Sequence, residues 1–183
     1  VDRAKPLFKG HKQPISPSLL GKYILDKDAS FFKIISHTKK YLDGVVYLHY
    51  WFDENTRTLE EMEIWHKNAE NIDQGFCLAW ANADWTHSWV GDDKTVIFKQ
   101  SYSESSFKKH AAYLADMVAS ENYTRIRSKP LCQVNTLNTE SIEYIELLVS
   151  ILRTHYEIDI IVMLPFKQRT NKKFDFEVKY YLY

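Results

Sequence analysis

Apolar residues form two kinds of pattern that alternate along the chain. Four short runs are almost continuously apolar, which is typical of strands buried on both faces of a parallel sheet. These runs are residues 45–52, 76–82, 130–135 and 158–164. Between them, apolar residues recur every three or four positions, as they do on one face of a helix. The pattern predicts an α/β fold in which parallel strands alternate with helices.

The helical periodicity predicts four helices, one before or after each strand. Their apolar stripes run over residues 31–42, 59–69, 107–118 and 142–152. Asp28 is the expected cap of the first helix, and Gly44 is its expected stop. Thr58 and Glu61 have the spacing of a capping box, which predicts that the second helix begins there.

An insertion separates the second and third predicted strands. The other strands follow one another at about the thirty residues of one strand–helix unit. The insertion contains the stretch ADWTHSW, which has two of the three tryptophans of residues 76–89 and few charges. A long loop is usually functional or disordered, and this one is too aromatic to be disordered. Later in the chain, residues 174–182 alternate between apolar and polar, which predicts an extra, half-exposed strand at the C-terminus.

Length and charge restrict the class of protein. The chain has 183 residues, the size of one domain. Its 24 lysines and arginines balance 24 aspartates and glutamates, so it lacks the charge expected of a nucleic-acid-binding protein. No apolar run reaches the length of a membrane span, and the N-terminus has no signal core. We expect a single α/β domain over residues 1–183, with no nucleic-acid partner and no transmembrane segment.

The two cysteines, Cys77 and Cys132, lie in separate apolar runs. Neither has a second cysteine or a histidine at metal-ligand spacing, so the sequence predicts no metal site and identifies no cofactor. Buried, reduced thiols are typical of a reducing compartment, which predicts a cytoplasmic protein. The first residue is Val1 rather than methionine, which favours an excised or trimmed piece.

Ligands of α/β sheets bind beyond the carboxyl ends of the parallel strands. Rings, amides and acids gather at these ends: His49, Tyr50, Trp51, Asp53, Glu54, Trp80, Asn82, Asp84, Trp85, His87, Trp89, Gln133 and Asn135. Sugars present apolar C–H faces and rims of hydroxyls, which suit flat rings beside amides and carboxylates. The residues therefore predict a saccharide site. Each tryptophan of the 76–89 stretch has a structural alternative in the core, and His49 has one as a hydrogen-bonded buried histidine.

Several sequence blocks occur in an order that is shared with a known family. They are AKPLFKGHKQP near the start, VYLHYWF, FCLAWANADWTHSWVG, the stretch Gln100-Ser101-Tyr102-Ser103, and KPL at residues 129–131. In this order they resemble the WbsX-like glycosyltransferase family, whose domain is similar to glycoside hydrolase family 99. The resemblance covers about residues 3–164 and leaves the tail at 166–183 unassigned. It implies a (β/α)₈ barrel that acts on sugars in making bacterial surface polysaccharides such as O-antigen or capsule.

The chain departs from the family pattern in two ways. Ala83, Asp84 and Val90 stand where the family has glutamate, asparagine and aspartate. The family's YLPQFH-like strand and its W-N-E-W-type motif, whose glutamates would do the chemistry, have no counterpart. A complete barrel of this kind has about 250 residues, so we expect an incomplete barrel of about five strands. A second copy in a homo-oligomer or a missing chain segment would then cover the open sheet edges.

Two functions remain in view. The first is a carbohydrate-active enzyme, a glycosyltransferase or a glycosidase-like protein, which needs two carboxylates about 5 to 10 Å apart. Asp84 paired with Asp53 or Glu54 is the candidate. The alternative is a non-catalytic sugar-binding or scaffold fragment. In both cases the expected contacts with the saccharide are His49, Tyr50, Trp51, Trp80, Asn82, Trp85, Trp89 and Gln100.

Overall fold

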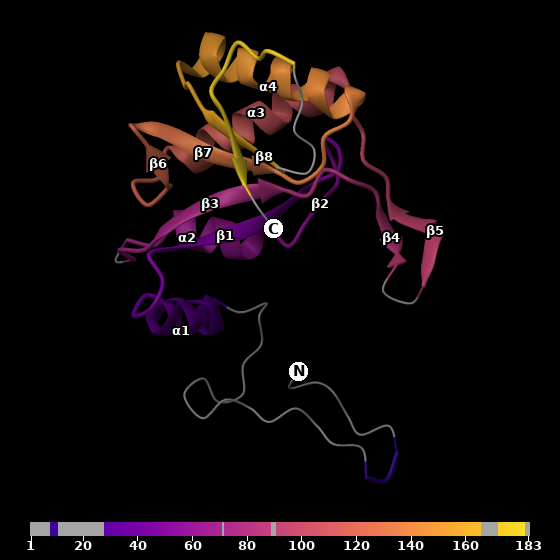
Figure 1. The fold of residues 1–183 in the computed structure, drawn as a ribbon. Helices are drawn as coiled ribbons and strands as arrows, with labels where there is room; N and C mark the ends of the chain where they lie inside the picture. The colour runs from indigo at the N-terminus through magenta and orange to yellow at the C-terminus, as the bar shows by residue number, and fades with distance from the viewer. Residues whose placement is uncertain (1–7, 11–27, 71, 89–90, 166–171, 182–183) are drawn as a thin grey trace.

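The structure, a computed structural model, describes residues 8–10, 28–70, 72–88, 91–165 and 172–181. Strands and helices alternate along the chain, as Figure 1 shows. They are α1 (Asp28–Thr38), β1 (Gly44–Trp51), β2 (Arg57–Thr58), α2 (Glu61–Lys67), β3 (Gly75–Trp80), β4 (Trp85–His87), β5 (Asp92–Phe98), α3 (Glu104–Val118), β6 (Arg125–Ile126), β7 (Lys129–Val134), α4 (Thr139–Tyr156), β8 (Ile161–Pro165) and β9 (Val178–Tyr181).

Five parallel strands form the main sheet, and they lie side by side in the order of the chain. The order is β1, β3, β7, β8 and β9, and the short β2 and β6 pair antiparallel with β1 and β7. Because these parallel strands alternate with helices, the predicted α/β class is confirmed. Their order does not reverse at a switch point, as it does in a doubly wound sheet. The strands described by the structure form an open sheet rather than a closed barrel.

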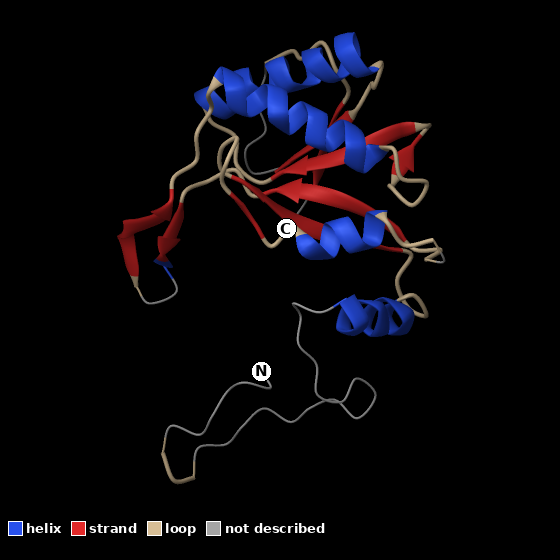
Figure 2. Ribbon diagram, turned by 180° about the vertical axis from the view of Figure 1, so that it is seen from behind, coloured by secondary structure: helices blue, strands red, loops and turns tan. Residues whose placement is uncertain are grey.

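Helices α2, α3 and α4 cover one face of this sheet (Figure 2). On β1, His49 contacts both Glu63 of α2 and His110 of α3. On β3, Trp80 packs against Tyr144 of α4. Successive side chains of a strand point to opposite faces, so alternate residues of each strand meet the helices. Helix α1 packs against α2 rather than joining this layer over the sheet.

The opposite face of the sheet is partly apolar and partly exposed. Val46 and Leu48 on β1 are exposed there, whereas Cys77 and Ala79 of the neighbouring β3 are buried. Tyr50 follows on the same face, at the carboxyl end of β1. This alternation positions Tyr50 for the site described below.

The hydrophobic core lies between the sheet and the two long helices α3 and α4. Its largest fully buried side chains include Trp80, Tyr144, Phe76, Leu78, Leu114, Met117, Ile145, Leu152, Ile161 and Leu164. They come from the apolar runs and stripes that the sequence pattern assigns to strands and helices. No helix in the part of the chain that the structure describes is long and apolar enough to cross a lipid bilayer.

The start of α2 and the end of α1 differ from the predicted ones. The capping box predicted for Thr58 and Glu61 is wrong, because Glu60 is the N-cap of α2 and no side chain caps it. Thr58 lies in β2, where it pairs with Tyr50 of β1 instead of capping the helix. Gly44 begins β1, and α1 already ends at Thr38.

The predicted loop after the second strand contains a β-hairpin. Strands β4 and β5 pair antiparallel and form a small sheet of their own, which projects from the main sheet in Figure 1. Their register shifts twice within three residues of β4, and such bulges remove the strict alternation by which a strand is found in a sequence. The strand predicted within residues 174–182 is β9, the parallel strand next to β8.

Candidate functional site

The carboxyl ends of β1, β3 and β7 surround a cavity of about 330 Å³, here called the aromatic cavity. It is lined by Tyr50, Phe52, Ala81, Asn82, Ala83, Asp84, Trp85, Asn135 and Thr136. Parallel strands end at the same edge of a sheet, so the side chains that end or follow them meet there. The structure thereby brings together five of the residues that the sequence placed at strand ends: Tyr50, Asn82, Asp84, Trp85 and Asn135.

Tyr50 and Trp85 form an apolar wall of this cavity. Their ring centroids are 5.1 Å apart with planes at 21°, which is an offset stack. Phe52 extends the wall, 6.2 Å from Trp85. Tyr50 reaches the cavity from the sheet face opposite the helices, and Trp85 reaches it as the first residue of β4. Two separate segments of the chain thus build one aromatic surface.

The polar residues of the cavity have different roles. Asn82 is buried, donates to the carbonyl of Thr136 at 2.6 Å and accepts from the Thr136 N–H at 2.8 Å. Its amide therefore joins the loops that follow β3 and β7. Asp84 is exposed, and its Oδ1 accepts the backbone N–H of Gln100 at 2.7 Å. Asp84 is thus held in place while its carboxylate faces the cavity and solvent.

Trp80 and Trp51 lie in the core rather than at the aromatic cavity. Trp80 is 1% exposed, and its indole N–H donates to the carbonyl of Trp51 at 3.0 Å. The indole N–H of Trp51 donates to Ser106 Oγ at 3.0 Å, on the helix side of the sheet. For Trp80, the structure shows the core alternative that the sequence left open. Trp89 lies outside the described residues.

Asp53 stabilises the turn after β1, and Glu54 joins this turn to the start of α3. The Asp53 carboxylate accepts the backbone N–H groups of Asn55 and Thr56 at 2.7 and 2.8 Å, and Glu54 accepts from Ser105 Oγ at 2.7 Å. Desolvation raises the pKa of Asp53, but these hydrogen bonds outweigh it and lower the pKa below its usual value. The Ser105 hydroxyl likewise lowers the pKa of Glu54. Neither acid lines the aromatic cavity with Asp84.

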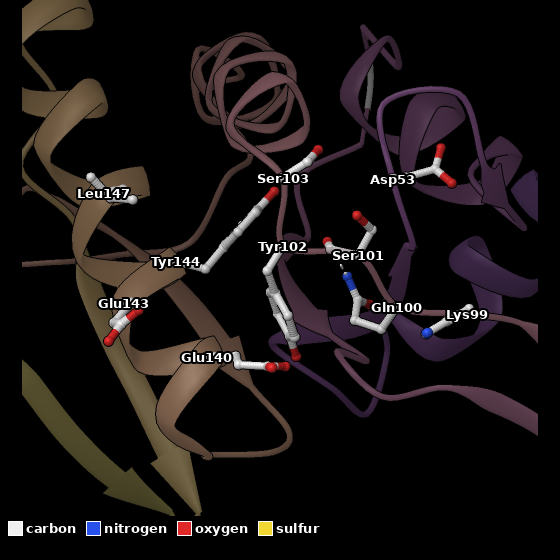
Figure 3. A pocket seen from close by; sticks show the side chains of 10 residues that line it. All are labelled: Asp53, Lys99, Gln100, Ser101, Tyr102, Ser103, Glu140, Glu143, Tyr144 and Leu147. Carbon is white, nitrogen blue, oxygen red and sulfur yellow. Dashed lines mark hydrogen bonds between the residues drawn. The ribbon is translucent and has the colours of Figure 1, made fainter.

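Gln100 lines a second cavity of about 660 Å³, here called the acidic cavity (Figure 3). Its lining is Asp53, Lys99, Gln100, Ser101, Tyr102, Ser103, Glu140, Glu143, Tyr144 and Leu147. The segment 99–103 contributes half of these residues, and α4 contributes most of the rest. Of the three carboxylates predicted to be catalytic, Asp84 and Asp53 therefore lie in different cavities.

A buried hydrogen-bond network joins the sheet to its helices. Its members, in order, are Trp51, Ser106, Tyr144, His110, His49, Glu63 and Tyr113, and the distances between partners lie between 2.7 and 3.3 Å. The indole N–H of Trp51 can only donate, so Ser106 Oγ accepts it, and Ser106 Oγ also forms a hydrogen bond with the Tyr144 hydroxyl. The members come from β1, α2, α3 and α4, so the network ties three helices to one strand.

Both ring nitrogens of each histidine take part in the network. His110 Nδ1 pairs with the Tyr144 hydroxyl, His110 Nε2 pairs with His49 Nε2, and His49 Nδ1–H donates to the Glu63 carboxylate. One of the two facing Nε2 atoms must accept, so at least one of these histidines is neutral. Burial, and then the proximity of His49, lower the pKa of His110 well below its ordinary value, which agrees with the neutral form. His49 is thus a hydrogen-bonded buried histidine.

The sequence reasoning did not identify Glu63, Ser106 or Tyr144 as members of a site. One signal was present, because His110 shares the apolar stripe of Phe107, Ala111 and Leu114 on α3. A polar residue on a buried helix face requires a partner. Its partners lie on other elements, however, and the spacing along one sequence does not show them.

The fold and the cavities define an α/β protein with an aromatic, acid-bearing site at the carboxyl edge of a parallel sheet. The sequence pattern of the family described as Glycosyltransferase WbsX matches residues 1–179. The chain therefore belongs to the WbsX glycosyltransferase family.

Curated relatives agree with this assignment. Two proteins from different strains of Xanthomonas campestris pv. campestris, each described as "Uncharacterized protein WxcX", are 33% identical to the chain over 137 residues. The match covers 73% of this chain and 19% of each relative, so the chain spans a minor part of the length of these relatives. No solved structure matches the chain.

Proposed function

We propose that the aromatic cavity binds a saccharide and that the chain contributes this site to a WbsX-type carbohydrate-active protein. The observation that supports it most is the stack of Tyr50 and Trp85 beside the exposed carboxylate of Asp84. A sugar ring would pack its C–H face on this apolar wall while its hydroxyls donate to Asp84 and Asn135. The volume of about 330 Å³ falls within the range of small-molecule sites.

The family supports glycosyl transfer as the reaction of the whole protein. In this chain Asp84 of the aromatic cavity is the acid that would contact the sugar. Glycosidic chemistry generally requires a second carboxylate opposite the first. Among the described lining residues of the aromatic cavity, Asp84 is the one acid. That observation favours a second candidate function, in which this chain binds the sugar without turnover by its own residues.

We also propose that the sheet is one wall of a (β/α)₈ barrel. The strand order follows the chain order, and the helices α2, α3 and α4 cover one face, as in such barrels. The free, buried Cys77 and Cys132 support a reducing, cytoplasmic environment. Burial raises the pKa of Cys77 to about 11 and, with the proximity of Cys77, that of Cys132 to about 12, so both remain protonated thiols at neutral pH.

Saccharide titrations followed by protein NMR test the proposed site. We expect a panel of neutral monosaccharides to shift resonances of Tyr50 and Trp85, and we expect Trp85→Ala to weaken binding about tenfold. The reason is the loss of a stacking surface, which contributes on the order of 1 kcal/mol beyond its buried area. Tyr41→Ala is the matched control, because Tyr41 is 75% exposed and precedes the amino end of β1, whereas the cavity lies at its carboxyl end. Equal affinity of Trp85→Ala and the unaltered chain would contradict the proposal.

Asp84→Asn separates the two candidate functions. If Asp84 is catalytic, sugar transfer by the protein falls by orders of magnitude while the affinity for the saccharide changes little. If this chain only binds the saccharide, Asp84→Asn leaves the rate of sugar transfer by the whole protein unchanged, and Asp84 has no part in the mechanism.

A further inference from the structure

The side-chain amide of Gln100 has a buried oxygen without a partner. Gln100 is 8% exposed, and its Oε1 accepts no hydrogen bond from the described residues. Its Nε2 donates to the carbonyls of Phe52 and Ser101, both at 3.1 Å. Turning the amide round would place oxygen against these two carbonyl oxygens, so the assignment of nitrogen and oxygen is fixed by the network. A buried acceptor of this kind calls for a donor.

The acidic cavity, which Gln100 lines, holds an excess of carboxylates (Figure 3). Its lining includes three acids, Asp53, Glu140 and Glu143, and one lysine, Lys99. Neither Glu140 nor Glu143 forms a hydrogen bond or ion pair with another residue that the structure describes. Glu140 lies in the first turn of α4, where the helix dipole alone favours an acid, but Glu143 lies beyond that turn. The cavity therefore offers acceptors and negative charge together.

The acidic cavity and the aromatic cavity share a wall. The backbone N–H of Gln100 donates to Asp84 of the aromatic cavity at 2.7 Å, and the Tyr102 hydroxyl donates to the carbonyl of Asn82 at 3.0 Å. Gln100 and Tyr102 line the acidic cavity, while Asn82 and Asp84 line the aromatic one. A saccharide held in one cavity lies next to the other.

We propose that the acidic cavity is a second subsite that binds a protonated amine, carried by an amino sugar with a free ammonium group. This proposal rests on saccharide binding at the aromatic cavity. The carboxylates of Glu140 and Glu143 attract the ammonium, and Gln100 Oε1 accepts a hydrogen from the ammonium or from a hydroxyl beside it. Neighbouring atoms cover this oxygen, so a donor reaches it only after the side chains around it move.

Three sugars that differ at one substituent test the subsite: glucosamine, N-acetylglucosamine and glucose. NMR titrations at neutral pH are expected to show glucosamine binding roughly fivefold more tightly than the other two, as two partly exposed ion pairs allow, with an advantage that shrinks at high salt. Glu140→Gln/Glu143→Gln is expected to abolish the advantage. Glu61→Gln/Glu70→Gln has the same change in charge at exposed residues of the α2 region and is expected to keep it.

The results separate this subsite from the aromatic site. If the aromatic cavity binds the sugars, Trp85→Ala weakens the binding of all three to the same degree. If Trp85→Ala leaves their affinities unchanged, the aromatic site is excluded, and the preference for glucosamine is then tested by the glutamate variants alone. Equal affinities for the three sugars, or a preference that survives Glu140→Gln/Glu143→Gln, overturn the ammonium subsite. A water molecule on Gln100 Oε1 in a crystal soaked with glucosamine, with no sugar in the cavity, overturns it as well.

Discussion

The Tyr144 hydroxyl shows how single residues determine the core of this protein. It lies between Ser106 Oγ at 3.2 Å and His110 Nδ1 at 3.3 Å and forms a hydrogen bond with each. Ser106 Oγ also accepts the indole N–H of Trp51. One hydroxyl on α4 therefore joins two polar side chains of α3 within the core.

Tyr144→Phe is expected to lower the free energy of unfolding by about 2 to 3 kcal/mol. The variant keeps the ring but leaves His110 Nδ1 unpaired and removes one of the two partners of Ser106 in the core, and a buried unpaired group costs about 1 to 3 kcal/mol. Tyr156→Phe on the same helix is the control, since Tyr156 is 41% exposed and its change should stay within about 0.5 kcal/mol. Urea unfolding followed by circular dichroism measures both. Equal stabilities of the two variants would mean that the network contributes nothing.

At the scale of elements, α4 has the most complete start of the capped helices. Asn138 accepts the backbone N–H of Ser141 at 2.7 Å, while the Ser141 hydroxyl accepts the backbone N–H of Asn138 at 2.8 Å. This reciprocal pair is a capping box. It positions the first turn of α4, from which Glu140 enters the acidic cavity.

Asn138→Ala is expected to reduce the free energy of unfolding by about 1 kcal/mol, because the first turn of α4 loses its cap. Thr58→Ala is expected to change it by less than about 0.5 kcal/mol, because the capping box that the sequence predicts at Thr58 is not formed. Thermal or chemical unfolding of the pair measures the difference. A larger loss for Thr58→Ala than for Asn138→Ala would contradict the assignment of the caps.

The sequence predicted those elements whose stability comes from burial. The parallel strands have continuous apolar runs because they are buried in the sheet, and α3 and α4 have apolar stripes because one side of each packs on that sheet. The hairpin of β4 and β5 was missed because its pairing is irregular and many of its side chains are exposed. Tyr50 and Trp85 were found together because parallel strands end at one edge, a rule that needs no contact information.

Other parts of the site depend on which way a side chain points, and the sequence does not decide this. Trp51 and Tyr50 are adjacent, yet one enters the core and the other enters the aromatic cavity. The acids Glu140 and Glu143 join the segment 99–103 through packing between elements that are distant in the sequence. The structure was needed to bring these residues together.

At the scale of the whole molecule, buried histidines lie between the sheet and the helix layer. His110 joins α3 to β1, and His66 joins α2 to the segment just before β3 by donating to the carbonyl of Gln74 at 2.8 Å. Burial is the main cause that lowers the pKa of each below its ordinary value. The folded protein therefore keeps both neutral at a pH where an unfolded histidine takes up a proton.

This difference predicts that stability falls as the pH drops below about 6.5, the ordinary pKa of histidine. Above that pH neither state binds the proton; below it the unfolded state binds more protons, so the free energy of unfolding decreases toward acid. For His110 the slope approaches about 1.4 kcal/mol per pH unit. Urea unfolding between pH 7 and pH 5 measures the slope. His110→Gln should make it shallower, and a flat profile for the unaltered chain would contradict the neutral state of His66 and His110.

Lys99 alone separates β5 from Gln100, and Gln100 leads within a few residues to the start of α3. The hairpin of β4 and β5 is therefore continuous with the segment that lines the acidic cavity, and its Trp85 lines the aromatic one. The backbone N–H of Gln100 also holds Asp84 of the aromatic cavity. A substitution that displaces the hairpin is therefore expected to change the lining of both cavities together.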